Sequence, residues 1–162
     1  MARSNHHTLL YIYATLSVVL AAALAACGHG TAYNHFHHVP VAGWEKNDTL
    51  TFAVPSLPTG GMYREELALR ISGDYPFMGL SLIVEQTVLP SHATRCDTLS
   101  CQLIDHHGNA VGRGVSQYQY AFPLPAQKLA PGDSLRIAVR HDMKRDILPG
   151  ITDIGIRLRR EN

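Results

Sequence analysis

Several side chains able to do chemistry are concentrated in the run HDMKRDILPGITDIG, from His141 to Gly155. The run contains one histidine, one lysine, one arginine and three aspartates, which are Asp142, Asp146 and Asp153. Two carboxylates at a suitable separation are sufficient for glycoside hydrolysis. The adjacent cations Lys144 and Arg145 favour ionised carboxylates, which suits ion pairing better than a general acid. We therefore expect a charged, paired turn between two strands, with Met143 closing the end of the core.

Other polar clusters in the sequence also lack a catalytic signature. The patterns G-x-S-x-G, H-E-x-x-H, Walker A and the Rossmann glycine motif do not occur. His106 and His107 stand beside Asp105, Gly108 and Asn109, which predicts an exposed turn. Four histidines between residues 28 and 43 have no neighbouring Asp or Glu, so a solvated linker is favoured over metal capture. The sequence predicts no enzyme activity, no catalytic residue, no metal site and no cofactor.

The amino-terminal residues carry a signal for covalent modification. Arg3 is the only charged residue before an apolar run that continues to Ala26. A basic start, an apolar middle and a small-residue end are typical of a secretory signal. The final residues Leu24, Ala25, Ala26 and Cys27 form a lipobox, in which the cysteine thiol becomes a thioether to diacylglycerol before cleavage. The alternative is an ordinary signal peptide or membrane anchor, although the run is marginal in length for a span.

Lipidation of Cys27, completed by an acyl chain such as palmitate, would attach the mature chain firmly to a membrane. Without the signal peptide the chain has 13 basic and 13 acidic side chains, since Arg3 is the only charge removed. This balance gives no indication of nucleic-acid binding. Cys96 and Cys101 are separated by about 16 Å if the segment is extended, whereas a disulfide needs Cα atoms within about 7 Å. Free thiols are favoured, with a turn-closing disulfide as the alternative.

Period-two alternation of apolar and polar residues predicts the fold. It occurs in six segments, which are DTLTFAV (48–54), ELALRIS (66–72), GLSLIVEQTV (79–88), DTLSCQLID (97–105), SLRIAVRHD (134–142) and TDIGIRLRR (152–160). Such segments are typical of antiparallel strands with one buried face. The segment 63–71 also permits a helix, through Leu67 and Ile71. We expect an all-β protein with a single antiparallel β-sandwich, of jelly-roll or immunoglobulin-like type.

The predicted organisation has three parts. Residues 1–26 form the lipoprotein signal peptide, residues 27–43 the lipidated cysteine and a flexible tether, and residues 44–162 the β-sandwich. Six cations near the carboxyl end are expected to form a partner-binding basic patch if their strands are neighbours, and they are Arg136, Arg140, Lys144, Arg145, Arg157 and Arg159. Such a patch would meet an acidic protein or anionic headgroups. The alternative is an ordinary solvated strand face.

Four longer segments, in order after the lipobox, resemble the gliding motility lipoprotein GldH family of Bacteroidetes. They are GWEKNDTLTF, LALRISGDYPFMGLSLIV, DTLSCQLIDHHGNAVGRG and HDMKRDILPGITDIGIRL. The resemblance implies a non-catalytic lipoprotein of the gliding apparatus. It also implies partners among other gliding lipoproteins, envelope proteins and the type IX secretion machinery. Because Gly28 offers no acidic retention cue, we expect attachment to the outer membrane, facing the periplasm.

A periplasmic lipoprotein that binds glycan or peptidoglycan is the alternative function. Tyr118 and Tyr120 alternate in SQYQYAF, which places both rings on one face of a strand. Such a pair of rings either forms an exposed platform for sugars or packs in the core.

Overall fold

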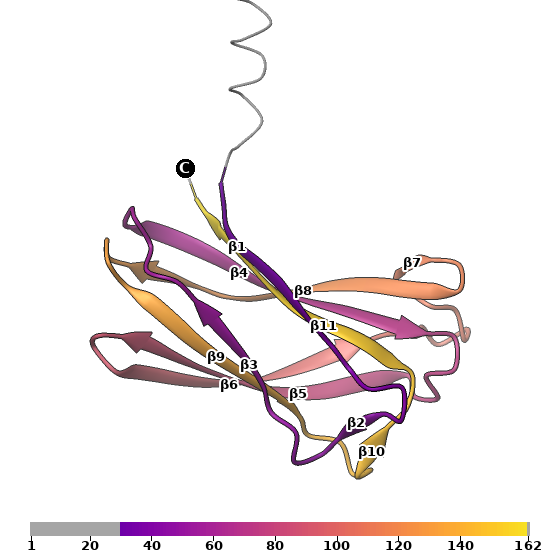
Figure 1. Cartoon of the computed structure of the whole chain (residues 1–162). Helices are drawn as coiled ribbons and strands as arrows, with labels where there is room; N and C mark the ends of the chain where they lie inside the picture. Colours follow the sequence, from indigo (N-terminus) through magenta and orange to yellow (C-terminus); the bar gives the residue numbers. More distant parts are fainter. Residues whose placement is uncertain (1–29, 162) are drawn as a thin grey trace, which may run out of the picture. The chain divides into compact units, whose positions relative to one another are not determined.

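The computed structural model describes residues 30–161, which form eleven β-strands and no helix. Figure 1 labels the strands along the chain. Their bounds are β1 Thr31–His38, β2 Trp44–Glu45, β3 Leu50–Val54, β4 Gly61–Ser72, β5 Gly79–Leu89, β6 Ala93–Gln102, β7 Arg113–Gly114, β8 Gln117–Leu129, β9 Ser134–His141, β10 Ile147–Leu148 and β11 Ile151–Arg160. Within this described part, no helix is long and apolar enough to span a membrane.

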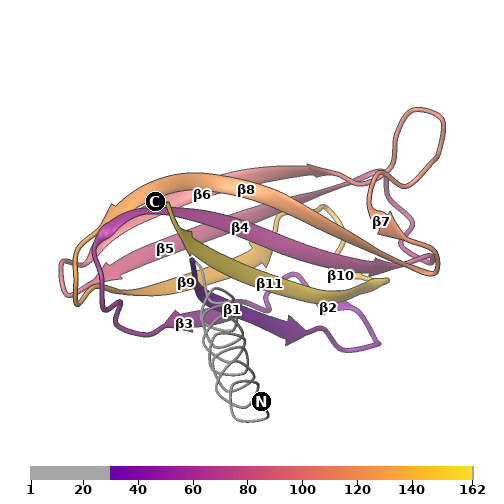
Figure 2. The ribbon, with the colours of Figure 1, turned by 90° about the horizontal axis from the view of Figure 1, so that it is seen from above.

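Two antiparallel sheets contain the long strands. The five-stranded sheet has the order β1-β11-β4-β8-β7, and the four-stranded sheet has the order β3-β9-β5-β6. In Figure 2 the two sheets lie one over the other, as the layers of a sandwich. A two-stranded sheet of β2 and β10 lies at one end. The predicted all-β sandwich is therefore confirmed.

Alternating burial explains why the strands form these layers. In β9, Leu135, Ile137 and Val139 are buried, whereas Arg136 and Arg140 are exposed. Burying one apolar face of each sheet against the other removes both faces from water, which is the main stabilising contribution. The helix alternative for residues 63–71 is wrong, because every second residue of β4 faces the core, as period two requires.

The predicted tether of residues 27–43 is wrong for Thr31–His38, which forms β1 at the edge of the five-stranded sheet. This strand pairs with β11 from Thr31 to His38. The rings of His35 and His37 lie 6.3 and 4.7 Å from the ring of Phe52, on β3 of the other sheet. His37 Nε2 is also 2.9 Å from the Thr51 carbonyl oxygen. These contacts close one edge of the sandwich, and the folded domain therefore begins well before Trp44.

The charged run that follows β9 is a structural connection, as predicted. His141 is 1% exposed and its ring lies 5.4 Å from that of Trp44, while Met143 packs against the core. Burial lowers the pKa of His141, and the cation of Lys46 acts in the same direction. The sequence predicts that the charged side chains of this turn pair with one another, and that prediction is wrong. Asp142, Lys144, Arg145 and Asp146 are exposed, and none of them is within 4.0 Å of an opposite charge in residues 30–161.

Candidate functional site

The lipidation residue and its lipobox lie outside the described residues. Cys27, Leu24, Ala25 and Ala26 precede the first residue that the structure describes, Gly30. Lipidation at Cys27 therefore stays a prediction from the sequence.

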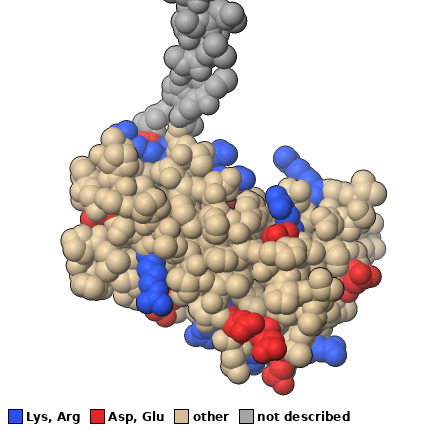
Figure 3. All heavy atoms as spheres, in the orientation of Figure 1, with Lys and Arg blue, Asp and Glu red and all other residues tan. Residues whose placement is uncertain are grey.

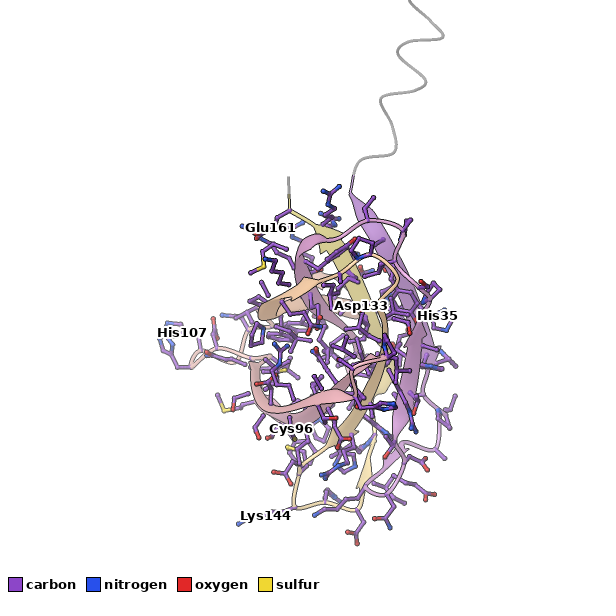
Figure 4. The ribbon with its side chains drawn as sticks, turned by 90° about the vertical axis from the view of Figure 1, so that its left-hand side faces the viewer. His35, Cys96, His107, Asp133, Lys144 and Glu161 are labelled. Atoms are coloured by element: carbon purple, nitrogen blue, oxygen red, sulfur yellow. The ribbon has the colours of Figure 1, made fainter. Side chains whose placement is uncertain are left out.

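The predicted basic patch is not assembled by the fold. Arg136 and Arg140 lie on β9 in the four-stranded sheet, whereas Arg157 and Arg159 lie on β11 in the five-stranded sheet. Because each pair faces away from the core of the sandwich, the two pairs point to opposite sides of the molecule. Lys144 and Arg145 lie in the loop after β9, and Figure 4 shows Lys144 at the end of the domain opposite Glu161. The patch of six cations is wrong, because neighbours in sequence belong to different sheets.

A groove does exist on the outer face of the five-stranded sheet, with a volume of about 730 Å³. Its floor follows from strand register, which aligns Phe36, Gly155, Ala68 and Ala121 across four strands. The Phe36 ring lies directly over Gly155, since a Cβ there would be 2.6 Å from it. Beside the Phe36 ring, the small side chains of Ala68 and Ala121 leave the middle of the sheet low, and this hollow is the groove.

Polar side chains flank the floor in two further aligned rows. One row aligns Asp153, Arg70, Gln119 and Arg113, and the other aligns Asn34, Arg157, Glu66 and Pro123. The lining of the groove contains three arginines and one carboxylate, which are Arg70, Arg113, Arg157 and Glu66. In Figure 3 the upper surface of the molecule dips, and basic side chains stand at the dip with an acidic one beside them. Several acidic side chains lie at the lower end, where β2 and β10 lie, together with a few basic ones.

The arginines of the groove differ in how they are held. The Arg70 guanidinium lies 4.4 Å from the centre of the Phe36 ring and 3.8 Å from an Asp153 oxygen. Arg157 NH1 donates to Glu66 Oε1 at 2.8 Å. Arg113 makes no side-chain hydrogen bond and no ion pair within residues 30–161. Of these three arginines, the basic patch predicted from the sequence contains only Arg157. Arg70 and Arg113 lie on β4 and β7, and the sequence pattern does not show that these strands lie in the same sheet as β11.

The tyrosine pair is part of the core and is no platform for a sugar. Tyr118 and Tyr120 share one face of β8, as predicted, but that face points into the sandwich. Tyr120 is 7% exposed, and its hydroxyl donates to the Leu103 carbonyl oxygen at 2.9 Å. Gly112 leaves space for this ring, since a Cβ there would be 2.5 Å from it.

A buried polar cluster links the two sheets and was missed from the sequence. Glu65 on β4 has a fully buried side chain. Its carboxylate accepts hydrogen bonds from Gln86 Nε2, at 2.5 Å, and from Gln127 Nε2. Arg95 lies 4.0 Å from Glu65 and 2.7 Å from Asp97. A charged residue at a core-facing position between Tyr63 and Leu67 is the signal that reveals such a cluster.

Opposing effects act on the Glu65 carboxyl group. Burial raises the pKa of Glu65 and is the largest effect, while the hydrogen bond from Gln127, the charge of Arg95 and the hydrogen bond from Gln86 lower it. Because both oxygens are engaged by neighbouring side chains, this carboxylate fits a structural link better than a catalytic acid.

The histidine pair lies at a loop tip, as predicted. The Asp105 carboxylate accepts hydrogen bonds from the backbone N–H groups of His107 and Asn109, both at 2.8 Å. These bonds close the turn, and Figure 4 shows His107 projecting from the body of the domain. In residues 30–161, no group of three or more metal-ligating side chains is present.

Comparison with known proteins assigns the family. A family model described as GldH lipoprotein matches residues 31–158, which is most of the chain and begins at β1. This chain belongs to the GldH lipoprotein family. The resemblance seen in the four sequence segments is confirmed.

A curated relative supports the same assignment. The gliding motility lipoprotein GldH of Flavobacterium johnsoniae is 25% identical over 152 residues, which cover 90% of this chain and 94% of the relative. The family match includes Thr31–His38, in agreement with a domain that begins at β1.

Similarity to solved structures is weak. Eiger, a tumour necrosis factor from S. frugiperda, is 14% identical with a TM-score of 0.38, covering 83% of this chain and 94% of that one. A family 35 carbohydrate-binding module from Clostridium thermocellum is 12% identical with a TM-score of 0.41, covering 78% and 89%. These similarities carry no inference about function.

Proposed function

We propose that this protein is a lipid-anchored, non-catalytic component of the gliding motility apparatus. Its role would be to support the assembly or stability of gliding and type IX secretion machinery. The observation that carries the proposal is the GldH lipoprotein match over residues 31–158, together with the curated relative's name, gliding motility lipoprotein. The lipobox that ends at Cys27 supports attachment to a membrane.

The environment of the charged residues supports a binding role. Asp153 is paired with His38 and Arg70, and the Glu65 carboxylate is enclosed by Gln86 and Gln127. The groove presents guanidinium and amide groups, which hold ligands and do not attack them. The proposed partners are other gliding and secretion lipoproteins and envelope proteins, reached from the periplasmic side of the outer membrane.

A deletion strain tests the role in the cell. Loss of the gene should reduce colony spreading, the secretion of proteins with a carboxy-terminal secretion signal, or both, and the wild-type gene should restore them. Normal spreading together with normal secretion in the deletion strain would contradict the proposal. In an organism without gliding, secretion is the measurement that decides.

The anchor is tested by Cys27→Ala in the same strain. The variant lacks the thiol that accepts the lipid, so we expect it to leave the membrane fraction and to fail to complement. Labelling with radioactive palmitate followed by membrane fractionation measures the first effect. Full complementation by an unlipidated protein would show that the anchor is dispensable.

Crosslinking in intact envelopes tests the partners. A tagged wild-type lipoprotein should recover gliding or secretion proteins reproducibly after crosslinking. A tagged outer-membrane lipoprotein of unrelated family is the control. Recovery of the same proteins by both baits would contradict a specific role in assembly.

A further inference from the structure

We propose that the groove on the five-stranded sheet binds an acidic polypeptide segment of a partner protein, with Arg70, Arg113 and Arg157 contacting its carboxylates. The proposal goes beyond the function above, because it concerns the chemistry of one surface and holds whichever machinery the protein serves. Three observations carry it: the unused hydrogen-bond donors of the arginines, the distances between the arginines, and the side chains that form the floor of the groove.

The free donors favour an anionic ligand. A guanidinium has five N–H donors in a planar fork that matches a carboxylate. Arg113 uses none of its side-chain donors within residues 30–161, and Arg157 uses NH1 alone, toward Glu66. Glu66 is paired with Arg157 and Asp153 lies 3.8 Å from Arg70, so Arg113 is the cation of the lining that has no carboxylate partner within residues 30–161. The amides of Asn34 and Gln119 add further donors at either side.

The spacing of the arginines favours an extended ligand with several negative charges. Arg70 and Arg113 are both aligned with Gln119, so they are two strands apart, or about 10 Å. Arg157 is aligned with Glu66, which is four residues from Arg70 along β4, or about 13 Å. Such separations match carboxylates three or four residues apart on an extended chain of about 3.3 Å per residue. A single small anion would contact only one of them.

The floor and shape favour a polypeptide over a sugar or a bilayer. Phe36 is the aromatic ring on the outer face here, and its ring is covered by the Arg70 guanidinium. Tyr120 and Phe122 also line the groove, but they belong to the core-facing side of β8, so the ring that the outer face presents is the covered Phe36. The groove is concave, with Ala68 and Ala121 at its base, so a flat membrane surface cannot follow it. A flexible acidic segment can enter it.

The test measures binding of a fluorescent oligo-glutamate peptide to the full-length lipoprotein in nonionic detergent, by anisotropy at low salt. Arg113→Gln should weaken binding about tenfold, since one charge-assisted pair is lost. Glu66→Gln should tighten binding about threefold, because it removes a repelling carboxylate and frees the Arg157 guanidinium. Arg136→Gln, which removes an exposed arginine from the opposite sheet, is the matched control and should bind as wild type does.

Each outcome decides the proposal. Opposite effects of Arg113→Gln and Glu66→Gln, with no effect of Arg136→Gln, would support it, since misfolding cannot tighten binding. Equal weakening by Arg113→Gln and Arg136→Gln would show that only net charge matters and would overturn the site. Absence of binding, or equal binding of an oligo-glutamine peptide, would overturn it as well. Stronger binding of polygalacturonate, or of anionic vesicles, would replace the polypeptide by a glycan or a membrane. Failure of the deletion experiment above would leave these binding results unchanged.

Discussion

At Gly155 the absence of a side chain is a packing requirement. The Phe36 ring occupies the position where a Cβ would stand, at 2.6 Å, and the Arg70 guanidinium lies over the same ring. The glycine has no unusual backbone angle, so its role is space and not flexibility. A larger residue here would push Phe36 outward and disturb the floor of the groove.

Gly155→Ala should therefore lower the free energy of unfolding by about 1–3 kcal/mol, as overpacking does at other closely packed positions. Chemical denaturation followed by the fluorescence of Trp44, the single and buried tryptophan, measures the change. Gly73→Ala is the control, because the nearest atom to its added Cβ is 4.0 Å away. Equal stability of the two variants would contradict the packing requirement.

The two cysteines of β6 face opposite ways and are both free thiols. Cys96 is exposed, whereas Cys101 is buried in the core, where burial raises its pKa to about 12. The sequence predicts free thiols from the distance between the two cysteines alone, because five residues of extended chain separate their Cα atoms too far for a disulfide. The alternation of DTLSCQLID also predicts Cys101 on the apolar face with Leu99 and Leu103, and the structure confirms that this face is the buried one.

In the native protein we expect a maleimide to label Cys96 and not Cys101. The thiolate is the reactive form, and Cys101 is both inaccessible and protonated at neutral pH. Mass spectrometry of labelled peptides, before and after unfolding, measures this difference. Cys96→Ser should abolish native labelling of the peptides from β6. Labelling that requires prior reduction would instead indicate a disulfide.

Among the elements, β1 is the strand for which the sequence pattern predicts a tether, and β8 is also absent from the six predicted segments, although the alternation of Tyr118 and Tyr120 indicates its first residues. Its inward residues are Tyr33, His35 and His37, and its outward residues include Phe36, so neither face is purely apolar. Periodicity needs a contrast between faces, and here aromatic and polar residues occur on both. The six segments that the pattern predicts show that contrast clearly, whereas β1 does not, and the sequence alone therefore indicates a tether there.

Replacement of Thr31–His38 by a Gly-Ser segment of the same length should destabilise the domain by at least about 3 kcal/mol, because the core loses Tyr33, which packs against it, and Gly155 loses the covering ring of Phe36. The length to the proposed anchor is unchanged, so only the strand is tested. A Gly-Ser replacement of His106–Asn109, at the exposed loop tip, is the control. An unchanged denaturation midpoint in the β1 variant would restore the tether interpretation.

β6 and β4 are joined by the polar cluster around Glu65. β6 is an edge strand of ten residues, and its Arg95 and Asp97 point toward the interior. Inward charges on an edge strand disfavour pairing with another chain. Gln86 accepts a hydrogen bond from Arg95, and together with Gln127 it donates to the buried Glu65 carboxylate, so the cluster supplies partners for these inward, partly buried charges.

Glu65→Gln should remove a component of the pH dependence of stability. Burial raises the folded-state pKa of Glu65 above its unfolded value near 4.5. The stabilisation from this group is thus fully present below about pH 4.5 and is lost as pH rises through the folded pKa. Each unit of raised pKa corresponds to about 1.4 kcal/mol. Relative to Glu65→Gln, the wild type should become less stable as pH rises.

Denaturation of both proteins across a pH series measures this difference. The comparison cancels the contribution of His141, whose lowered pKa acts in the opposite sense by weakening the fold as pH falls below 6.5. A wild type that gains stability over Glu65→Gln with rising pH would reverse the sign and contradict the assignment.

For the whole molecule, the sequence predicts the class of fold but not its surfaces. Alternation within each strand reports which side chains are buried, whereas the order of strands depends on contacts between distant segments. β9 and β11 are successive long strands, yet they belong to different sheets, and this divides the predicted basic patch. The groove is assembled from β4, β7 and β11 in the same way, so Arg70 and Arg113 could not be grouped beforehand.

The early start of β1 limits how far the domain can stand from a bilayer. If Cys27 is lipidated as proposed, four residue steps separate the lipid from Thr31, which is at most about 14 Å of extended chain. A tether ending at Trp44 would have allowed about 60 Å. In that case the start of β1 would stay within this distance of the headgroups, and any reach beyond it would come from the length of the folded domain and not from a flexible linker.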